Sequence, residues 1–389
     1  MGVASYLVAA TPPRLAVGGI IVALPVLAVE QLGDVAIGGL LAAAALGPSI
    51  VAAPIAGAML DRSRRPGALI AGAGIATAAA FTMAAFLGPI PAWVVAVALV
   101  LAGATTPFFF GGLSSFVTEG ISDERRAFAI DALSYNLGAV VGPAAVAATT
   151  ALGSARAATL IIAGFALLGA AGTLPLRLRP LASTHERRSM LATIAAGFRH
   201  IATHRPLAIV TASGTLSQFG NGGLTIAAVA LAVSRAGDPA EGPIIVTAFA
   251  VGGLLGALWI SRRPSRRTPE FLMGAGFAAT GVFTVLAAID LGSIWTIAAI
   301  GISGVFTASS SAAMLLIRKQ QSPPALRSQV FTVGAGLRAA AAAAGAAVAG
   351  LAAGVGAEAL LVAIGVVWIA SGAMLLAYPT GAPAIDGEG

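Results

Sequence analysis

The chain has 389 residues, of which 58% are hydrophobic and only 10% are charged, and its formal net charge is +7. A soluble domain carries about 25% charged residues, so these charges could not cover a water-facing surface, and lipid must solvate much of the protein. The absence of cysteine excludes disulfides, thiol nucleophiles and thiolate metal sites. The basic residues do not cluster with aromatic ones, so the positive charge does not indicate nucleic-acid binding.

Polar breaks divide the sequence into twelve apolar stretches, each near the roughly 20 residues that a membrane-spanning helix needs. The spans that we expect are 13–31, 36–59, 67–89, 91–117, 127–151, 156–175, 206–233, 242–261, 268–289, 292–317, 327–354 and 357–378. The apolar runs are continuous and do not alternate with polar residues, which argues against a β-barrel. The sequence therefore predicts an all-α membrane protein with twelve transmembrane helices.

The basic residues are distributed unequally between the two sides of these spans. No basic residue precedes Arg14, so the first span is interpreted as a retained helix and not as a cleaved signal. Nineteen Lys and Arg residues, Arg14 included, fall on one side, whereas only Arg156 and Arg235 fall on the other. Because basic residues are retained on the cytoplasmic side, both termini are predicted to be cytoplasmic, in the inner (cell) membrane of a bacterium.

The longest polar segment, 178–205, separates the sixth span from the seventh. It predicts a six-helix N-terminal unit (1–177), a cytoplasmic linker (178–205) and a six-helix C-terminal unit (206–389). Apolar residues in the linker recur at helical spacing, which fits an amphipathic helix on the inner membrane surface and equally an ordinary charged linker. The second and eighth spans both end in a glycine followed by an arginine-rich loop, and internal repeats of this kind are characteristic of transporters.

The loop after the second span reads Gly57-Ala58-Met59-Leu60-Asp61-Arg62-Ser63-Arg64-Arg65. It resembles the loop signature of the major facilitator superfamily, G-x-L-x-D-R-x-G-R-R, and lies between the second and third helices, as it does in that family. Met59 and the Ser63-Arg64-Arg65 run depart from the pattern, but its Gly, Asp and Arg remain. With the twelve spans and the half-repeat, the resemblance covers nearly the whole chain and implies two pseudo-symmetric six-helix bundles, the major facilitator fold.

The resemblance implies a conformational lock in this loop. A carboxylate at the end of a helix can accept hydrogen bonds from the N-terminus of a neighbouring helix, and glycine permits close helix approach. The lock would break when the transporter opens inward. Its expected members are Gly57, Asp61, Arg62, Arg64 and Arg65, together with Glu119 at the end of the fourth span. The alternative is that the arginines only follow the positive-inside rule and that Glu119 is solvated.

A second resemblance lies in the fifth span, where Gly138, Gly142 and Pro143 match the G-x-x-x-G-P core of the family's antiporter motif. The trailing glycines of the full motif are absent, because Ala144 and Ala145 follow. Two glycines on one helix face permit tight packing, and proline removes a backbone hydrogen bond and permits a bend. The resemblance implies export.

Polar residues within spans are candidates for coupling and for substrate contact. Asp131 is the best candidate for proton coupling, and the alternative is a structural pair with an inner-loop arginine. Arg338 lies roughly 16 Å beyond the start of its span, near the middle of the membrane, and either lines the cavity or has a structural partner. The further cavity candidates, each of which could instead make a packing hydrogen bond, are Asn136, Gln218 and Asn221.

The rest of the expected cavity wall is apolar and includes Phe108, Phe109, Phe110 and Phe116. We therefore expect a secondary transporter, functional as a monomer in membrane lipid, that exports a lipophilic or amphipathic small molecule by proton antiport. One alternative is a proton-coupled importer of a small organic anion bound by Arg338; another is a non-transporting receptor or a membrane enzyme. The spans carry no cluster of His or acidic residues and no G-x-x-x-x-G-K loop, so we expect no catalysis, metal or cofactor.

Overall fold

The computed structural model describes residues 2–117, 124–176, 178, 190–262, 267–323 and 326–379. Its helices are α1 (Val3–Leu32), α2 (Val35–Leu46), α3 (Ser49–Arg62), α4 (Pro66–Ala84), α5 (Ala92–Pro107), η1 (Phe108–Gly112), α6 (Glu124–Leu152), α7 (Ala155–Thr173), α8 (Met190–Thr203), α9 (Arg205–Ala236), η3 (Pro239–Glu241), α10 (Gly242–Arg262), α11 (Pro269–Ala287), α12 (Ser293–Gln320), α13 (Arg327–Leu351), η4 (Ala353–Val355), α14 (Ala357–Ala373) and η5 (Met374–Ala377). Within the described residues, twelve spans are long and apolar enough to cross a membrane. The predicted all-α fold class is confirmed.

Most helix ends differ from the predicted spans by at most about five residues, and two spans differ more. The first helix begins at Val3 instead of residue 13, and Pro12 and Pro13 lie inside it. Proline is tolerated within membrane helices because neighbouring helices satisfy the backbone groups that it frees. The second span is divided into α2 and α3 at Gly47 and Pro48.

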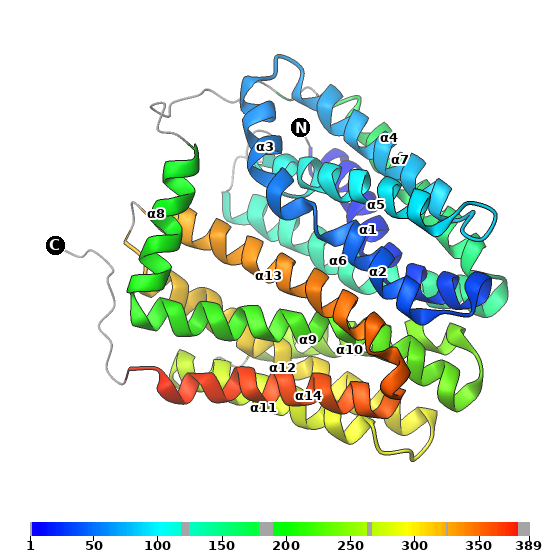
Figure 1. The fold of residues 1–389 in the computed structure, drawn as a ribbon. Helices are drawn as coiled ribbons and strands as arrows, with labels where there is room; N and C mark the ends of the chain where they lie inside the picture. The colour runs from blue at the N-terminus through cyan, green and yellow to red at the C-terminus, as the bar shows by residue number, and fades with distance from the viewer. Residues whose placement is uncertain are drawn as a thin grey trace.

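The spans form two groups that lie side by side (Figure 1). In the first group α1 packs against α6 and α7, and α4 packs against α5 and α7. In the second group α9 packs against α13 and α14, and α12 packs against α10 and α11. Small residues let these helices approach closely, as van der Waals packing in lipid requires.

Helix α8 belongs to the segment between the two groups, where a helix is one of the two structures that the sequence fits. Its residue Ile201 is buried in a cluster with Leu207, Val330 and Val333, which lie on α9 and α13. Ile201 is therefore covered by the second bundle, whereas Phe198 on the same helix is exposed. In Figure 1, α8 crosses the ends of α9 and α13.

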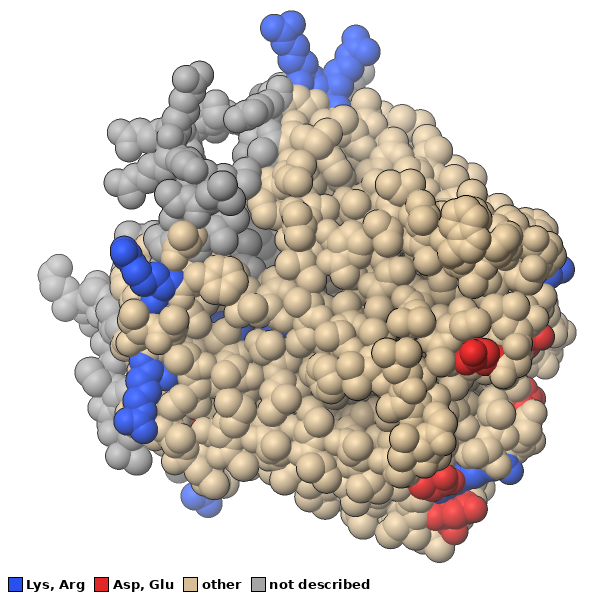
Figure 2. Space-filling view, in the orientation of Figure 1, with Lys and Arg blue, Asp and Glu red and all other residues tan. Residues whose placement is uncertain are grey.

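Charged side chains gather at the two ends of the bundles. Figure 2 shows most of the visible Lys and Arg at the end where α8 lies, and the visible Asp and Glu at the opposite end. Arg14 is an exception, because it is 1% exposed inside α1. Its assignment to the basic face of the membrane is wrong.

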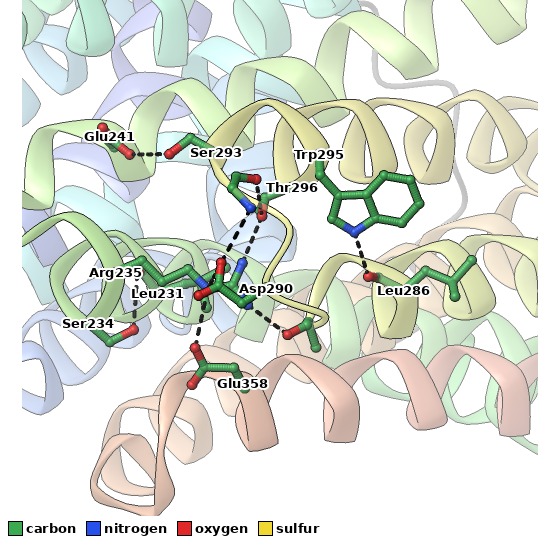
Figure 3. A network of polar contacts seen from close by, with 12 residues as sticks. Leu231, Ser234, Arg235, Glu241, Leu286, Asp290, Ser293, Trp295, Thr296 and Glu358 are labelled. Atoms are coloured by element: carbon green, nitrogen blue, oxygen red, sulfur yellow. Dashed lines mark hydrogen bonds and ion pairs between the residues drawn. The ribbon is translucent and has the colours of Figure 1, made fainter.

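The arginines at the opposite end, Arg156 and Arg235, each hold a helix end. In the second bundle the Nη2 atom of Arg235 donates to the carbonyl of Ala288, at the end of α11, over 2.6 Å. Its Nε atom lies 3.2 Å from Glu358 Oε1 on α14. Figure 3 shows this network joining helices of the second bundle.

The first bundle repeats the arrangement. The Nε atom of Arg156 donates to the carbonyl of Ala85, at the end of α4, over 3.0 Å. Its Nη2 atom donates to Gln31 Oε1 on α1, also over 3.0 Å. Because α4 and α11 are the third spans of their halves, each arginine binds the same end of an equivalent helix. The two exceptions to the charge bias are thus explained by local hydrogen bonding.

Candidate functional site

A cavity of about 630 Å³ lies between the two bundles. Its walls come from α3, the end of α5 with η1, α8 and α13, and most of the lining residues are apolar. They are Ser49, Ile50, Ala53, Pro54, Gly57, Leu60, Thr106, Pro107, Phe110, Gly111, Gly112, Ser115, Phe198, Val333, Ala335, Gly336, Leu337, Ala339 and Ala340. A space of this volume and lining suits a small apolar or amphipathic ligand.

The bundles meet at the end away from α8. A Cβ atom placed on Gly39 of α2 would lie 2.6 Å from the carbonyl oxygen of Ala346 and 2.8 Å from the Cα of Gly350, both on α13. Such distances leave no room for a side chain, so the two helices touch backbone to backbone. This contact closes the cavity at that end.

The close contact between the two bundles, made by α2 and α13, ends at the break between α2 and α3. Before Gly47 and Pro48, α2 packs closely on α13, whereas α3 beyond them lines the cavity. In Figure 1, α3 stands away from α13 near α8. The structure is therefore closed at the end away from α8 and hollow toward the end where α8 lies.

The phenylalanines expected in the cavity wall divide between two environments. Phe110 lines the cavity, but Phe109 and Phe116 are 2% and 0% exposed in the core of the first bundle, and Phe108 packs against that core, partly buried. Their assignment to the wall is wrong. Residues Phe108 to Gly112 form a π-helical segment, which turns successive side chains in directions that a regular helix would not give.

Part of the expected lock lies outside the described residues, namely Glu119 and the side chains of Asp61 and Arg62. Arg64 and Arg65 are exposed. Gly57 lines the cavity, and a Cβ atom placed there would meet nothing within 4 Å. In this conformation, Gly57 is therefore not a point of close helix contact, contrary to expectation.

The two glycines of the fifth span do form such a contact, with the first helix. A Cβ atom on Gly138 would lie 2.9 Å from the carbonyl oxygen of Arg14, and one on Gly142 would lie 2.7 Å from that of Leu15. Pro143 is buried beside them. Helix α6 is thus packed directly on the backbone of α1.

Asp131 of α6 is buried at the centre of a polar network. Its Oδ1 atom lies 2.7 Å from Arg14 Nη1, accepts a hydrogen bond from the Tyr6 hydroxyl and accepts another from Ser114 Oγ over 3.0 Å. The guanidinium of Arg14 also stacks on the ring of Tyr135, with 3.7 Å between its Cζ atom and the ring centroid. The ion pair therefore joins α1 to α6 inside the first bundle.

The network reaches the cavity wall. Arg14 Nη2 donates to Ser114 Oγ over 2.8 Å and to the carbonyl of Phe110 over 3.5 Å. Since Phe110 lines the cavity, a single side chain, that of Arg14, connects Asp131 to the cavity wall. Sequence reasoning missed Arg14 as the partner of Asp131, although an isolated arginine inside an apolar stretch was the available signal.

A second buried charge cluster lies in the other bundle. Arg338 of α13 is half-buried, and its Nε atom has no hydrogen-bond partner among the described residues. Arg318 of α12, which the sequence placed at the basic end of its span, is 1% exposed and lies close enough for its charge to repel that of Arg338. The structure thus pairs a predicted site residue with a residue that was not predicted.

The remaining candidates do not line the central cavity. Asn136 is exposed on α6, and Gln218 and Asn221 are half-buried on α9. Arg338 is not among the lining residues either, so the structure brings none of the four together in that cavity.

Comparison with known proteins gives matches over most of the chain. The sequence model of the Major Facilitator Superfamily matches residues 14–268. An uncharacterised MFS-type transporter from Sinorhizobium fredii, y4rN, is 25% identical over 349 residues, which are 87% of this chain and 85% of that protein.

Solved structures share the fold at low sequence identity. The nucleoside transporter NupG superposes with a TM-score of 0.80 at 13% identity, over 97% of this chain and 99% of that one. A POT family transporter in complex with a thioalcohol-conjugated peptide gives a TM-score of 0.73 at 14% identity, over 97% and 96% of the two chains. The predicted arrangement of two six-helix bundles is confirmed by these superpositions.

Proposed function

Because the chain belongs to the major facilitator superfamily, we propose that it is a secondary active transporter that exports a lipophilic or amphipathic small molecule in exchange for protons. The observation that carries the proposal is the largely apolar cavity of about 630 Å³ between the bundles. Sugars and other strongly polar solutes need many hydrogen-bonding side chains, which this lining does not provide. A substrate with an apolar body would instead bind favourably, because its apolar surface would leave water and contact the apolar lining of the cavity.

Export is supported by the packing of α6 on α1 through Gly138 and Gly142, the contact expected from the antiporter-like motif. Proton coupling is assigned to Asp131, the buried acid whose ion pair with Arg14 extends to the cavity wall at Phe110. Protonation of Asp131 would remove the negative charge that pairs with Arg14. It would thereby destabilise the conformation that contains this ion pair relative to other conformations of the first bundle.

We also propose that both termini are cytoplasmic, because the loops that follow α3 and α10 are rich in arginine and basic loops are retained on the cytoplasmic side. The cavity then opens toward the cytoplasm in the present conformation. The bundles would rock about a midplane site, closing one end as the other opens.

Transport by inside-out vesicles tests the function directly. Vesicles containing the protein should accumulate a fluorescent lipophilic compound when their interior is made acidic, because protons leaving the vesicle drive the compound inward. Accumulation should cease when an ionophore collapses the proton gradient. Equal accumulation by vesicles without the protein, or accumulation that does not depend on the proton gradient, would contradict the proposal.

The lock is tested by Asp61→Asn, which keeps the side-chain volume and removes the charge. Transport should fall while expression and membrane insertion are unchanged, because the carboxylate biases a conformational equilibrium. A lock contributing about 1–3 kcal/mol would shift the populations about 5- to 150-fold. Arg64→Gln in the same loop is the control for a simple loss of loop charge. An Asp61→Asn transporter with wild-type rates would count against the lock.

A further inference from the structure

Two arginines of the second bundle, Arg318, which is buried, and Arg338, which is half-buried, form no ion pair among the described residues. Arg318 is 1% exposed, and its Nε and Nη2 atoms have no hydrogen-bond partner among the described residues. The same holds for the Nε atom of Arg338. A guanidinium does not lose its proton in proteins, so both charges persist.

Most of the neighbouring helices carry no acidic residue. Neither α9, α10, α12 nor α13 contains an aspartate or a glutamate, and the described part of α8 contains none. Helix α11, which packs against α12, has Glu270 in its first turn, but no ion pair joins it to Arg318 among the described residues. The described ion pairs of the second bundle lie at its other end, around Arg235. Two like charges in a membrane protein without a compensating group are costly, which favours binding of an anion from outside the chain.

The packing holds the arginines in place. A Cβ atom on Gly334 of α13 would lie 2.8 Å from the Cζ and Nη1 atoms of Arg318, so the guanidinium rests on the α13 backbone. On the α9 side, a Cβ atom on Gly214 would lie 3.7 Å from Arg318 Nη2. Gly334 thus leaves room for the guanidinium where a larger residue would crowd it, and Gly214 is in ordinary van der Waals range of it.

Further polar atoms face the same region. The hydroxyls of Thr211 and Thr215, which flank Gly214 on α9, are buried and have no hydrogen-bond partner among the described residues. Both threonines line a groove of about 520 Å³ that Leu337 also borders. Leu337 and Ala339, the neighbours of Arg338, line the central cavity. Arg338 therefore lies directly behind the wall of the space assigned to the substrate, although it is not itself a lining residue.

We propose that Arg318 and Arg338 form a binding site for the carboxylate or phosphate head of an amphipathic substrate, whose apolar body occupies the central cavity. Two guanidinium groups and two hydroxyls supply donors for such an oxyanion, and the lining of the cavity accepts a hydrocarbon chain. The inference rests on the proposed transport function and narrows its substrate to organic anions.

Binding to the purified full-length protein tests the site with four probes: octanoate, 1-octanol, octyltrimethylammonium and inorganic phosphate. Octanoate should raise the midpoint of thermal unfolding, whereas the alcohol and the cation of the same chain length should not. Phosphate should act only at much higher concentration, because it has no apolar body. Arg318→Gln and Arg338→Gln should each weaken the effect of octanoate by about tenfold or more, as expected for loss of a charged hydrogen bond.

The matched control is Lys319→Gln, which removes the same charge from the exposed neighbour of Arg318 and should leave octanoate binding unchanged. Without ligand, the two Gln variants should unfold no earlier than the wild type, since each relieves repulsion between like charges. If either fails to fold, Arg318→Lys or Arg338→Lys keeps the charge and should still weaken binding, because the planar pair of donors is lost.

Other results would overturn the inference in distinguishable ways. Octanoate binding that persists in both Gln variants, or equal stabilisation by 1-octanol, would remove the anion site while leaving transport of lipophilic compounds intact. Phosphate acting as strongly as octanoate would show a site for a free anion and overturn the assignment to a substrate head. If none of the three octyl probes binds the wild type and the vesicles accumulate nothing, the proposed function itself fails.

Discussion

Asp131→Asn is expected to abolish accumulation driven by a proton gradient. The amide keeps the shape of the carboxylate but cannot take up and release the proton that exchanges for substrate. It also leaves Arg14 buried without its ion pair, and breaking a buried pair costs about 3–5 kcal/mol of stability. Both effects would be measured on the same preparation, by transport in vesicles and by thermal unfolding in detergent.

A double variant separates the two roles of Asp131. Arg14→Gln with Asp131→Asn removes both charges, so the stability lost in the single variant should largely return. Proton-driven accumulation should stay absent, while exchange of substrate down its own gradient continues. Recovery of gradient-driven accumulation in the double variant would mean that Asp131 is only a structural partner of Arg14. Ser134→Ala, which removes a hydroxyl that contacts Arg14, is the control for disturbing the network without altering its charge.

Gly39→Leu is expected to trap the protein with its cavity open at the end away from α8. A leucine cannot fit where a single Cβ atom would stand 2.6 Å from the backbone of α13, so the conformation described here would be destabilised. A bias of about 1–3 kcal/mol shifts the two states by about 5- to 150-fold. Transport should fall accordingly, because cycling requires that both ends close in turn.

Single cysteines report the shift, since the chain has none of its own. Ala335→Cys in the cavity should react with a membrane-impermeant reagent only from the cytoplasmic side, and less so once Gly39→Leu is added. Ala42→Cys, buried where α2 meets the second bundle, should change from protected to reactive from outside. Gly72→Leu is the control, because a Cβ atom there meets nothing within 4 Å. Labelling of Ala335→Cys from outside in the wild type would contradict the proposed orientation.

Much of the fold was predictable because its signals are local. The length of an apolar run decides whether it crosses a membrane, and Asp238 and Gly292, near the predicted starts of the eighth and tenth spans, stand at actual helix starts. The break at Pro48 was not predicted. The resemblance to the major facilitator superfamily rests on the loop from Gly57 to Arg65, the twelve spans and the half-repeat, and the match of the superfamily model to residues 14–268 bears it out. The close packing predicted from Gly138 and Gly142 is also present, because small residues on one face of a membrane helix allow another helix to approach closely.

What the sequence by itself determined about this protein is therefore the number of spans, their division into two halves and the side on which basic residues gather. The tertiary structure alone decided which faces meet. These helices are apolar all round, so their sequences carry no polar face to orient them. The ion pair of Arg14 with Asp131, the burial of Arg318 against Gly334, and the separation of Phe110 from Phe109 all depend on contacts between helices distant in sequence or on the π-helical segment. In helices that are apolar on nearly every side, the shapes of the packed helices decide which faces meet, and buried polar pairs such as Arg14 and Asp131 form where that packing brings them together.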